Sequence, residues 1–455
     1  MINNHTMSKY TYIVRNYHAI KEAVIKLDGI TVLSGVNGCG KSTLSRWLYY
    51  IINGTNNFEK FLYADYKENI RHLVNRMQYA CMDLGRYNRQ KHEQLRISID
   101  QLYEIVEKLK VVNVDSKEQV NTVYDLFIQA LNTTREFLTL AFDENIPEAR
   151  KARIISYLNQ EIKDNDLDKA IKEFYGRNER FISILTNKLY RNLEERPYNT
   201  FFESINTHFL IDDKAPSDIH LEEDGVDILE TEHISTTFNL QRAIYVDTPM
   251  AIGAGETDNP FWSALRDMMI SEENKSNSSQ EKKLLARIKH LLHGEAVLQD
   301  DTLFNDKQLR YISSDNRINI DISRVATGFK TFSYLQRLME NGYLNTGTLL
   351  MIDEPEAHLH PQWIVEYARL LVMLNKQLGL KIMMASHNPD MVAAIHDIAY
   401  KEDILNNTNF YAARPAPDTG LYIYHELGHE IGEIFESFNI ALENIHRYGA
   451  VGIQQ

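Results

Sequence analysis

The chain has 455 residues, 44% of them hydrophobic and 25% charged, which is typical of a soluble globular protein with two or three units. The formal net charge of −14 argues against non-specific coating of DNA or of an anionic membrane, although a local basic patch could still exist. Cys39 and Cys81 are the two cysteines, so we expect no disulfide framework and a cytoplasmic location. The polar start MINNHTMSKY does not resemble a signal peptide, and no apolar run has the length of a membrane span.

The first part of the chain predicts strands followed by one helix. Residues 10–34 alternate or run apolar, which predicts two or three strands, the last at 30–34. A glycine-rich turn follows, and then a helix is expected at roughly 41–52. The Asn53-Gly54 pair is a good signal for the C-terminal end of that helix.

The middle of the chain changes character. Residues 56–200 contain few glycines and prolines and carry apolar residues at helical spacing, which predicts a mainly helical insertion. LRISID, residues 95–100, is a candidate strand inside it. The expected units are therefore an N-terminal part at 1–55, the insertion, and a C-terminal part at 201–455.

Sheet structure is expected again after the insertion. RAIYVDTP (242–249) predicts a strand, and the polar segment 271–280 predicts a mobile loop. KQLRYISS and RINIDIS, within residues 307–323, resemble a hairpin. GTLLMIDE (347–354) and LKIMMASH (380–387) are short apolar runs, typical of strands buried on both faces of a parallel sheet. The helix between them is expected to begin at Pro361 and to end at Gly379.

GVNGCGKST, residues 35–43, fits the pattern G-x-x-x-x-G-K-[ST] and lies between an expected strand and an expected helix. Its glycines let backbone N–H groups surround phosphate oxygens, and the helix N-terminus adds partial positive charge. Lys41 can bridge the β- and γ-phosphates, and Ser42 can hold Mg²⁺. The expected nucleotide-binding residues are Gly35, Asn37, Gly38, Cys39, Gly40, Lys41, Ser42 and Thr43.

LLMIDEPEAHLHP, residues 349–361, supplies the complementary acidic groups. Asp353 ends an expected buried strand, where its carboxylate can reach Mg²⁺, and Glu354 can orient or deprotonate the attacking water. His387 ends the next buried strand and could contact the γ-phosphate and sense its loss. Thr327-Gly328 precedes a helix and offers a hydroxyl and free N–H groups, although spacing alone favours an ordinary threonine N-cap.

Together these four motifs resemble the ABC-type ATPase heads of the SMC, RecF and overcoming-lysogenization-defect (OLD) families, over residues 10–55 and 300–400. IDEPEAHLHP is close to the OLD and RecF-like form, and ATGFK is similar to the family signature S-G-G or S-S-G, with threonine for serine. The resemblance implies an α/β P-loop ABC-type head with a mixed sheet, interrupted by the helical insertion, with ATP and Mg²⁺ as cofactors.

The resemblance also implies that two heads dimerise head to tail. Thr327 and Gly328 of one chain would then cap the γ-phosphate held by Lys41 of the other. The family has a glutamine loop, for which Gln78 and Gln101 are candidates without convincing context.

The main functional hypothesis is an ATPase whose nucleotide-dependent dimerisation controls a partner effector. The tail after His387 is too short for the TOPRIM nuclease domain of OLD proteins, so the effector is expected in another chain, such as a nuclease. This arrangement resembles the ATPase halves of bacterial anti-phage systems. A RecF-like DNA-repair clamp, with DNA as partner, is the alternative. The motor subunit of a membrane transporter is a third interpretation, disfavoured because the signature lies far from the phosphate loop.

A zinc-peptidase pattern, HELGH, occurs at residues 425–429. Zinc would require a helix that aims both imidazoles at the metal and a third ligand. LYIY just before it alternates like a strand, and Phe435 stands where a metzincin has its third histidine. The favoured interpretation is a strand, a turn at Gly428 and a C-terminal helix. His358 and His360 are expected to line the dimer interface.

Overall fold

The computed structural model divides into two compact units. It describes residues 8–82, 89–108, 116–139, 147–158, 166–248, 257, 259–271, 278–301 and 306–435. The sheet unit comprises Met1–Asn56 and Ile205–Gln455, and the helical unit comprises Asn57–Ser204. Among the described residues, no helix combines the length and the apolar character that a membrane crossing requires.

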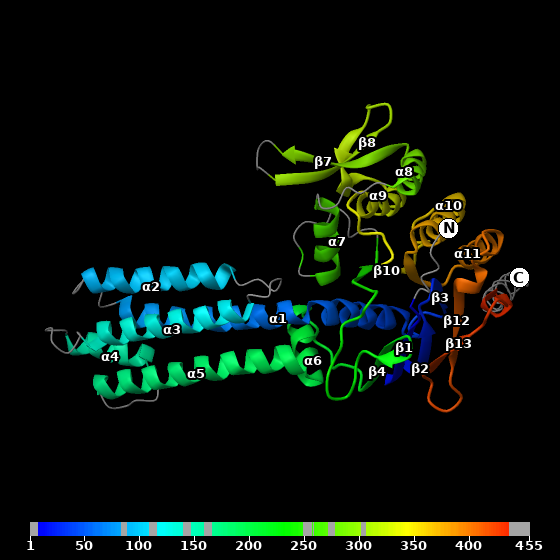
Figure 1. Ribbon diagram of the computed structural model, residues 1–455. Helices are drawn as coiled ribbons and strands as arrows, with labels where there is room; N and C mark the ends of the chain where they lie inside the picture. Colours follow the sequence, from blue (N-terminus) through cyan, green and yellow to red (C-terminus); the bar gives the residue numbers. More distant parts are fainter. Residues whose placement is uncertain are drawn as a thin grey trace, which may run out of the picture. The chain divides into compact units, whose positions relative to one another are not determined.

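One sheet forms the frame of the sheet unit (Figure 1). Its described strands run in the order β5-β4-β1-β2-β13-β12-β3-β11-β10-β6. Their bounds are β1 (Tyr10–Tyr17), β2 (Ile20–Lys26), β3 (Ile30–Ser34), β4 (Asp218–Glu223), β5 (Val226–Asp227), β6 (Arg242–Val246), β10 (Thr348–Asp353), β11 (Lys381–Ser386), β12 (Thr408–Pro415) and β13 (Tyr422–Glu426). The strands predicted before the phosphate loop are confirmed as β1 to β3, and those predicted from the later apolar runs as β6, β10 and β11.

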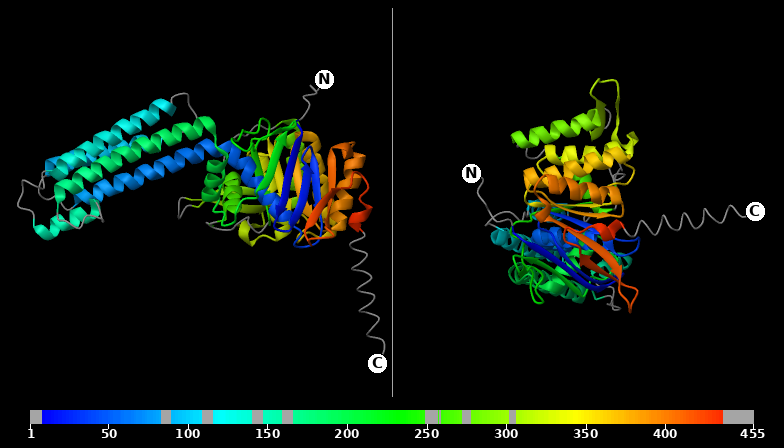
Figure 2. Two further views of the ribbon diagram at one scale, coloured as in Figure 1. Left: turned by 90° about the horizontal axis from the view of Figure 1, so that it is seen from below. Right: turned by 90° about the vertical axis from the view of Figure 1, so that its right-hand side faces the viewer.

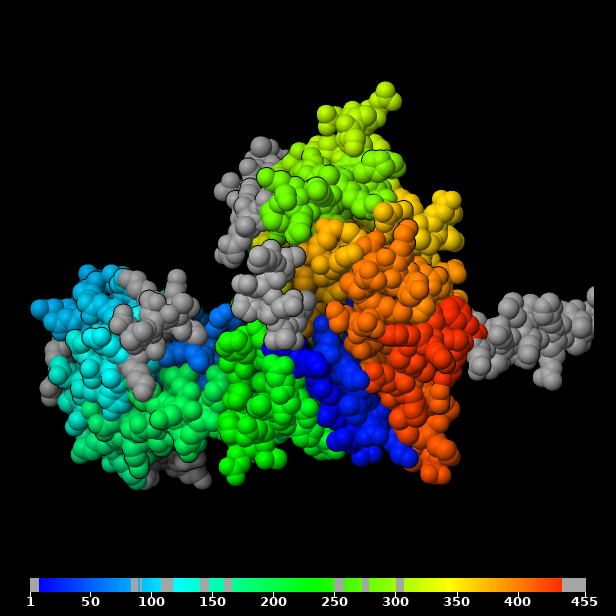
Figure 3. All heavy atoms as spheres, turned by 45° about the vertical axis from the view of Figure 1, so that its right-hand side comes forward, coloured from blue at the N-terminus to red at the C-terminus, as the bar shows by residue number. Residues whose placement is uncertain are grey.

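The parallel part of the sheet decides where the functional loops meet. Strands β6, β10, β11, β3 and β12 are parallel neighbours, so their carboxyl ends lie at one edge. Every residue of β3, β10 and β11 is buried, as the continuous apolar runs predict. Strands β1, β2 and β4 pair antiparallel, as do β12 and β13, which confirms the mixed sheet. Figure 3 shows the blue surface of β1 and β2 beside the orange-red surface of β12 and β13.

Helices and a second, smaller sheet complete the sheet unit. The helices are α7 (Pro260–Ile270), α8 (Ser279–Leu292), α9 (Thr327–Glu340), α10 (Pro361–Leu378) and α11 (Pro389–Lys401), with short 3₁₀ turns at Ile322–Arg324 and Leu405–Asn407. Helices α8, α9 and α10 lie together in Figure 2 and share one buried apolar core with β3, β10 and β11. The small antiparallel sheet contains β7 (Gly294–Asp301), β8 (Asp306–Ser313) and β9 (Asn319–Asp321), which confirms the predicted hairpin.

The helix after the phosphate loop does not end where its sequence signal predicts. Helix α1 (Lys41–Met82) continues through Asn53-Gly54, so the predicted stop near residue 52 is wrong. The Asn53 side chain instead bonds to strand β6: its Nδ2 donates to the Ala243 carbonyl at 2.9 Å, and its Oδ1 accepts from the Ala243 N–H at 3.0 Å. Tertiary hydrogen bonds to β6 thus keep Asn53 in the helix, although its local sequence could end the helix there.

The helical unit confirms the predicted mainly helical insertion. It contains the rest of α1 together with α2 (Arg89–Lys108), α3 (Ser116–Thr139), α4 (Glu148–Leu158), α5 (Leu167–Glu195) and the start of α6 (Tyr198–His208). Figure 1 shows α2, α3 and α5 running alongside one another, with α4 against α5.

The candidate strand at 95–100 is wrong, because this segment lies inside α2. Among the described side chains of α2, Leu95, Ile99, Leu102 and Val106 are buried; they are spaced by three or four positions, so they form one face of a helix. The short apparent alternation in LRISID is part of that longer helical period.

Helix α10 begins at Pro361 and is capped by Gly379, as predicted. Gln78 and Gln101 both lie inside helices, so neither occupies a loop, and the glutamine-loop residue stays unassigned. The predicted loop at 271–280 lies mostly outside the described residues, and so does the part of the predicted C-terminal helix that follows Phe435.

Candidate functional site

The phosphate loop spans the turn between β3 and α1. Lys41 is the first residue of α1, and its Nζ donates to the carbonyls of Gly35 at 2.8 Å and Val36 at 3.1 Å. The ammonium group is therefore held within the curve of the loop. Gly40 has φ +98°, and a Cβ there would lie 2.7 Å from the Ile20 Cγ1, so both the backbone and the space require glycine. Such a loop at a helix N-terminus is a ready anion site.

A tyrosine from the far end of the chain supports this loop. Tyr424 on β13 is buried, and its hydroxyl donates to the Cys39 carbonyl at 3.2 Å. The Cys39 thiol lies 3.7 Å from the same hydroxyl. Sequence reasoning missed Tyr424, because its place depends on β13 lying beside β12, which in turn pairs with β3.

Asp353 lies at the carboxyl end of β10, beside the first turns of α1. The residue is only 6% exposed, and its carboxylate accepts hydrogen bonds from the Ser45 Oγ at 3.0 Å and the Tyr245 hydroxyl at 2.7 Å. The Ser42 side chain, in the first turn of α1, is a further neighbour of this carboxylate. Burial raises the pKa of Asp353, while the hydroxyl groups of Ser42, Tyr245 and Ser45 oppose that shift. The structure thus joins the two residues expected to hold Mg²⁺.

Tyr245 is a second residue that sequence reasoning missed. It lies on β6 opposite Met351 of β10, so the parallel pairing of these strands places it beside Asp353. Arg46 of α1 is a charged neighbour of Tyr245. Burial raises the pKa of Tyr245, so its hydroxyl keeps its proton and donates to the carboxylate. A tyrosine within an apolar strand gives no sequence signal for this role.

Glu354 and His387 meet at the same edge of the sheet. Glu354 has φ +48°, an uncommon conformation for a residue with a Cβ. Its N–H donates to the Ala385 carbonyl at 2.8 Å, which holds it against the end of β11. The Oε1 of Glu354 lies 3.4 Å from the Nδ1 of His387, and both side chains are 48% exposed. An acidic group open to solvent is thus paired with the histidine that was expected to sense the γ-phosphate.

The Thr327-Gly328 pair lies elsewhere, at the start of α9. Ala326 is the N-cap and Thr327 already belongs to the helix, so the threonine N-cap interpretation is wrong. Gly328 is buried, and a Cβ there would lie 3.1 Å from the Trp363 ring, which gives this glycine a packing role within the chain. Its expected role toward the phosphate of a second chain stays a prediction.

The HELGH segment does not have the geometry of a zinc peptidase. His425 and Glu426 belong to strand β13, and Gly428 has φ +59° in the following turn, which confirms the strand-and-turn prediction. The two histidines therefore do not share a helix face. Within the described ranges, no group of three or more His, Cys, Asp or Glu side chains is arranged to hold a metal ion.

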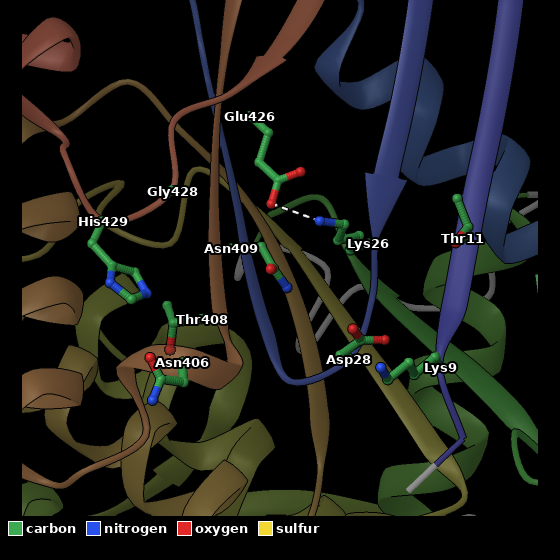
Figure 4. Close-up of a pocket in the computed structure, with 10 residues that line it drawn as sticks. All are labelled: Lys9, Thr11, Lys26, Asp28, Asn406, Thr408, Asn409, Glu426, Gly428 and His429. Carbon is green, nitrogen blue, oxygen red and sulfur yellow. Dashed lines mark hydrogen bonds and ion pairs between the residues drawn. The ribbon is translucent and has the colours of Figure 1, made fainter. Parts of the chain in front are cut away.

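Figure 4 shows a polar pocket of about 320 Å³ beside this segment. It lies at the amino ends of β3 and β12, so the phosphate loop is at the opposite edge of the sheet. Lysines and acids both line it, and Lys26 forms a 2.8 Å ion pair with Glu426. These opposite charges favour no single class of ligand. The lining residues are Lys9, Thr11, Lys26, Asp28, Asn406, Thr408, Asn409, Glu426, Gly428 and His429.

The family comparison identifies the class of protein to which the site belongs. A model described as the AAA ATPase domain matches residues 11–392, which is most of the chain. The chain belongs to this AAA ATPase family. The match confirms the predicted ATPase head and, with the observed mixed sheet, its α/β fold class. Members of an ATPase family bind nucleotide, and the loop at Gly35–Thr43 is the candidate site for it in this AAA ATPase.

Solved structures of SMC head domains are similar to this AAA ATPase. The head with an extended coiled coil from Pyrococcus furiosus, bound to the C-terminal domain of ScpA, is 10% identical; the match covers 96% of this chain and 98% of that chain, with a TM-score of 0.31. The SmcHead bound to the C-winged helix domain of ScpA is 12% identical, with coverage of 93% and 98% and a TM-score of 0.37. At these scores the likeness supports no argument about function. A search of curated proteins finds no match.

The contact between Tyr245 and Asp353 leads to a testable prediction. Tyr245→Phe is expected to raise the Mg²⁺ concentration needed for half-maximal nucleotide binding, because the carboxylate beside Ser42 loses one of its donors. Removing one donor from this buried carboxylate is also expected to lower the free energy of unfolding by about 1–3 kcal/mol. Binding of a fluorescent ATP analogue over a Mg²⁺ series and urea unfolding measure the two effects.

Tyr334→Phe is the matched control for this prediction. It also removes a buried tyrosine hydroxyl, but that hydroxyl pairs with Tyr367 between α9 and α10. We expect it to affect stability without changing the Mg²⁺ requirement. Equal Mg²⁺ requirements in wild type and Tyr245→Phe would contradict a role for Tyr245 in holding Asp353.

Proposed function

We propose that this AAA ATPase binds ATP with Mg²⁺ and hydrolyses it to ADP and phosphate. The observation that carries the proposal is the meeting of Lys41, Ser42 and Asp353 at the carboxyl edge of the parallel strands. Lys41 and the backbone of Gly35–Thr43 bind the phosphates. Ser42 is exposed and lies beside Asp353, so the two can hold Mg²⁺, which usually takes few protein ligands together with the phosphates.

Glu354 and His387 supply the chemistry at the γ-phosphate in this proposal. The Glu354 carboxylate is half exposed, so it can accept a proton from an attacking water. His387, beside it, contacts the γ-phosphate and responds to its loss. The shared position at the ends of β10 and β11 supports these roles.

We further propose that ATP binding closes a dimer of two heads. Thr327 and Gly328 of one copy would face the triphosphate on the other, because α9 begins there and its N-terminus favours negative charge. Two nucleotides held between two copies would supply the differential contacts that stabilise the closed state. Hydrolysis would release them, and the helical unit would pass the change to a separate effector protein, such as a nuclease in anti-phage defence.

A pull-down with the Glu354→Gln variant tests the effector proposal. This variant should accumulate the ATP-bound dimer, so it should retain the partner in the presence of ATP and Mg²⁺. Lys41→Ala, which should bind no nucleotide, is the control bait. An effector enzyme identified by mass spectrometry with the first bait and missing with the second supports the proposal. ATP-dependent, salt-sensitive DNA binding without any protein partner would instead favour the DNA-clamp alternative.

A further inference from the structure

A third acidic residue lies between the two turns that carry Glu354 and His387. Glu356 follows β10 by three positions, yet it is only 7% exposed. The Ser386 hydroxyl donates to its Oε2 at 2.9 Å, and the His387 N–H donates to its Oε1 at 3.3 Å. The same Oε1 lies 3.6 Å from the Nδ1 of His387. All three of these contacts go to the end of β11 and the turn after it.

The burial of this carboxylate requires a physical reason. Removing a charged group from water is costly unless partners replace the lost hydration. Burial raises the pKa of Glu356, and hydrogen bonds from its own backbone N–H, from Ser386 and from the His387 backbone, together with the His387 ring, oppose that shift. Apart from its own backbone N–H, the partners that offset the cost of burial are therefore those that fix the turn holding His387.

The contacts also orient the imidazole. The Nδ1 of His387 faces two carboxylates, at 3.4 Å from Glu354 and 3.6 Å from Glu356. Because Nδ1 and Nε2 lie on different sides of the ring, this leaves Nε2 directed away from the acids. Glu354 is half exposed, whereas Glu356 is buried and bonded to the backbone of the same turn, so Glu356 is the fixed member of the pair.

We propose that Glu356 is a positioning residue, which acts through His387 by holding its turn and ring so that Nε2 meets the γ-phosphate. This inference rests on the proposed function, because it assigns Glu356 a role in the same ATP hydrolysis. It requires no contact between Glu356 and nucleotide. The second glutamate of the segment 353–356 thus has a role different from that of Glu354.

A double-mutant cycle tests this inference. Glu356→Gln retains the volume of the side chain and a carbonyl oxygen for the His387 N–H, but removes the charge beside Nδ1. It is expected to lower kcat by about tenfold, the scale seen when a residue that orients a functional group is changed. The affinity for ATP should change little. The effect of Glu356→Gln should vanish in a His387→Ala background, because residues that act as a unit are not additive.

Controls separate this inference from a structural effect and from the proposed function. Asp390→Asn changes an exposed acid in the first turn of α11, close in sequence to His387, and should leave kcat unchanged. If Glu356→Gln does not fold, Ser386→Ala, which removes the other hydrogen bond to Glu356, replaces it in the same cycle. If the reductions in kcat caused by Glu356→Gln and His387→Ala multiply in the double variant, the inference is overturned. The proposal that the protein hydrolyses ATP would still stand. A wild-type protein without Lys41-dependent ATPase activity would overturn both.

Discussion

Lys41→Ala is expected to abolish nucleotide binding. The positively charged side chain of Lys41, at the start of α1, lies within the phosphate loop. Its Nζ donates hydrogen bonds to the Gly35 and Val36 carbonyls. Hydrogen bonds to charged groups contribute about 1.5–3 kcal/mol each, so losing contacts to two phosphates costs roughly 3–6 kcal/mol. Since 1.4 kcal/mol is a factor of ten, the affinity for ATP should fall by about a hundredfold or more. Isothermal titration with ATP and Mg²⁺ measures this loss.

Lys60→Ala provides the matched control. Lys60 lies on the same helix, but it is exposed, and its Nζ donates to the neighbouring Asn57 side chain. This variant should bind ATP like wild type. Far-ultraviolet circular dichroism should show that both variants retain their helices. ATP binding by Lys41→Ala at wild-type affinity would mean that the triphosphate does not occupy the Gly35–Thr43 loop.

Glu354→Gln is expected to bind ATP normally but hydrolyse it slowly. Glutamine has the size of glutamate, yet it cannot take a proton from water. Losing a general base typically costs a factor of about 10²–10⁴, so we expect kcat to fall by about a hundredfold or more. Because the nucleotide persists, ATP-bound dimer should accumulate. Single-turnover kinetics and size-exclusion chromatography with light scattering measure the two effects.

Glu430→Gln is the control for this variant, because Glu430 is an exposed acid in the turn after β13, at a distance in sequence from the phosphate-binding motifs. It should neither slow hydrolysis nor change the proportion of dimer. Wild-type turnover by Glu354→Gln would show that another group activates the water. If Glu354→Gln hydrolyses ATP slowly but forms no ATP-dependent dimer, the result would support the catalytic role of Glu354 and contradict the head-to-tail assembly.

Several parts of the site were predictable because their signals are local. The phosphate loop is a run of nine residues whose glycines and lysine have fixed spacing, and it lies between a strand and a helix as expected. Asp353 and His387 each follow a continuous apolar run, and such runs indicate strands buried in a parallel sheet. Because parallel strands end at one edge, the proximity of these residues could be expected before the order of the strands was known.

Other predictions failed where tertiary contacts overrule local preference. Asn53-Gly54 has the composition of a helix end, but Asn53 bonds to Ala243 on β6 and α1 continues. Residues 95–100 alternate briefly like a strand, but Leu95, Ile99 and Leu102 face one buried side of a helix. A short pattern compatible with two structures is decided by what it packs against.

The sequence by itself determined that this protein has a phosphate loop, an acidic strand end and a helical insertion, because these depend on spacing between near neighbours. Only the tertiary structure brought Tyr245, Tyr424 and Glu356 into contact with residues of the candidate site. Tyr245 is 108 residues from Asp353, and Tyr424 is 385 residues from Cys39. The contacts of the two tyrosines exist because β6 pairs with β10 and β13 lies next to β12 in the sheet. The residues that flank each tyrosine in the sequence do not indicate which distant strand will pair with its own.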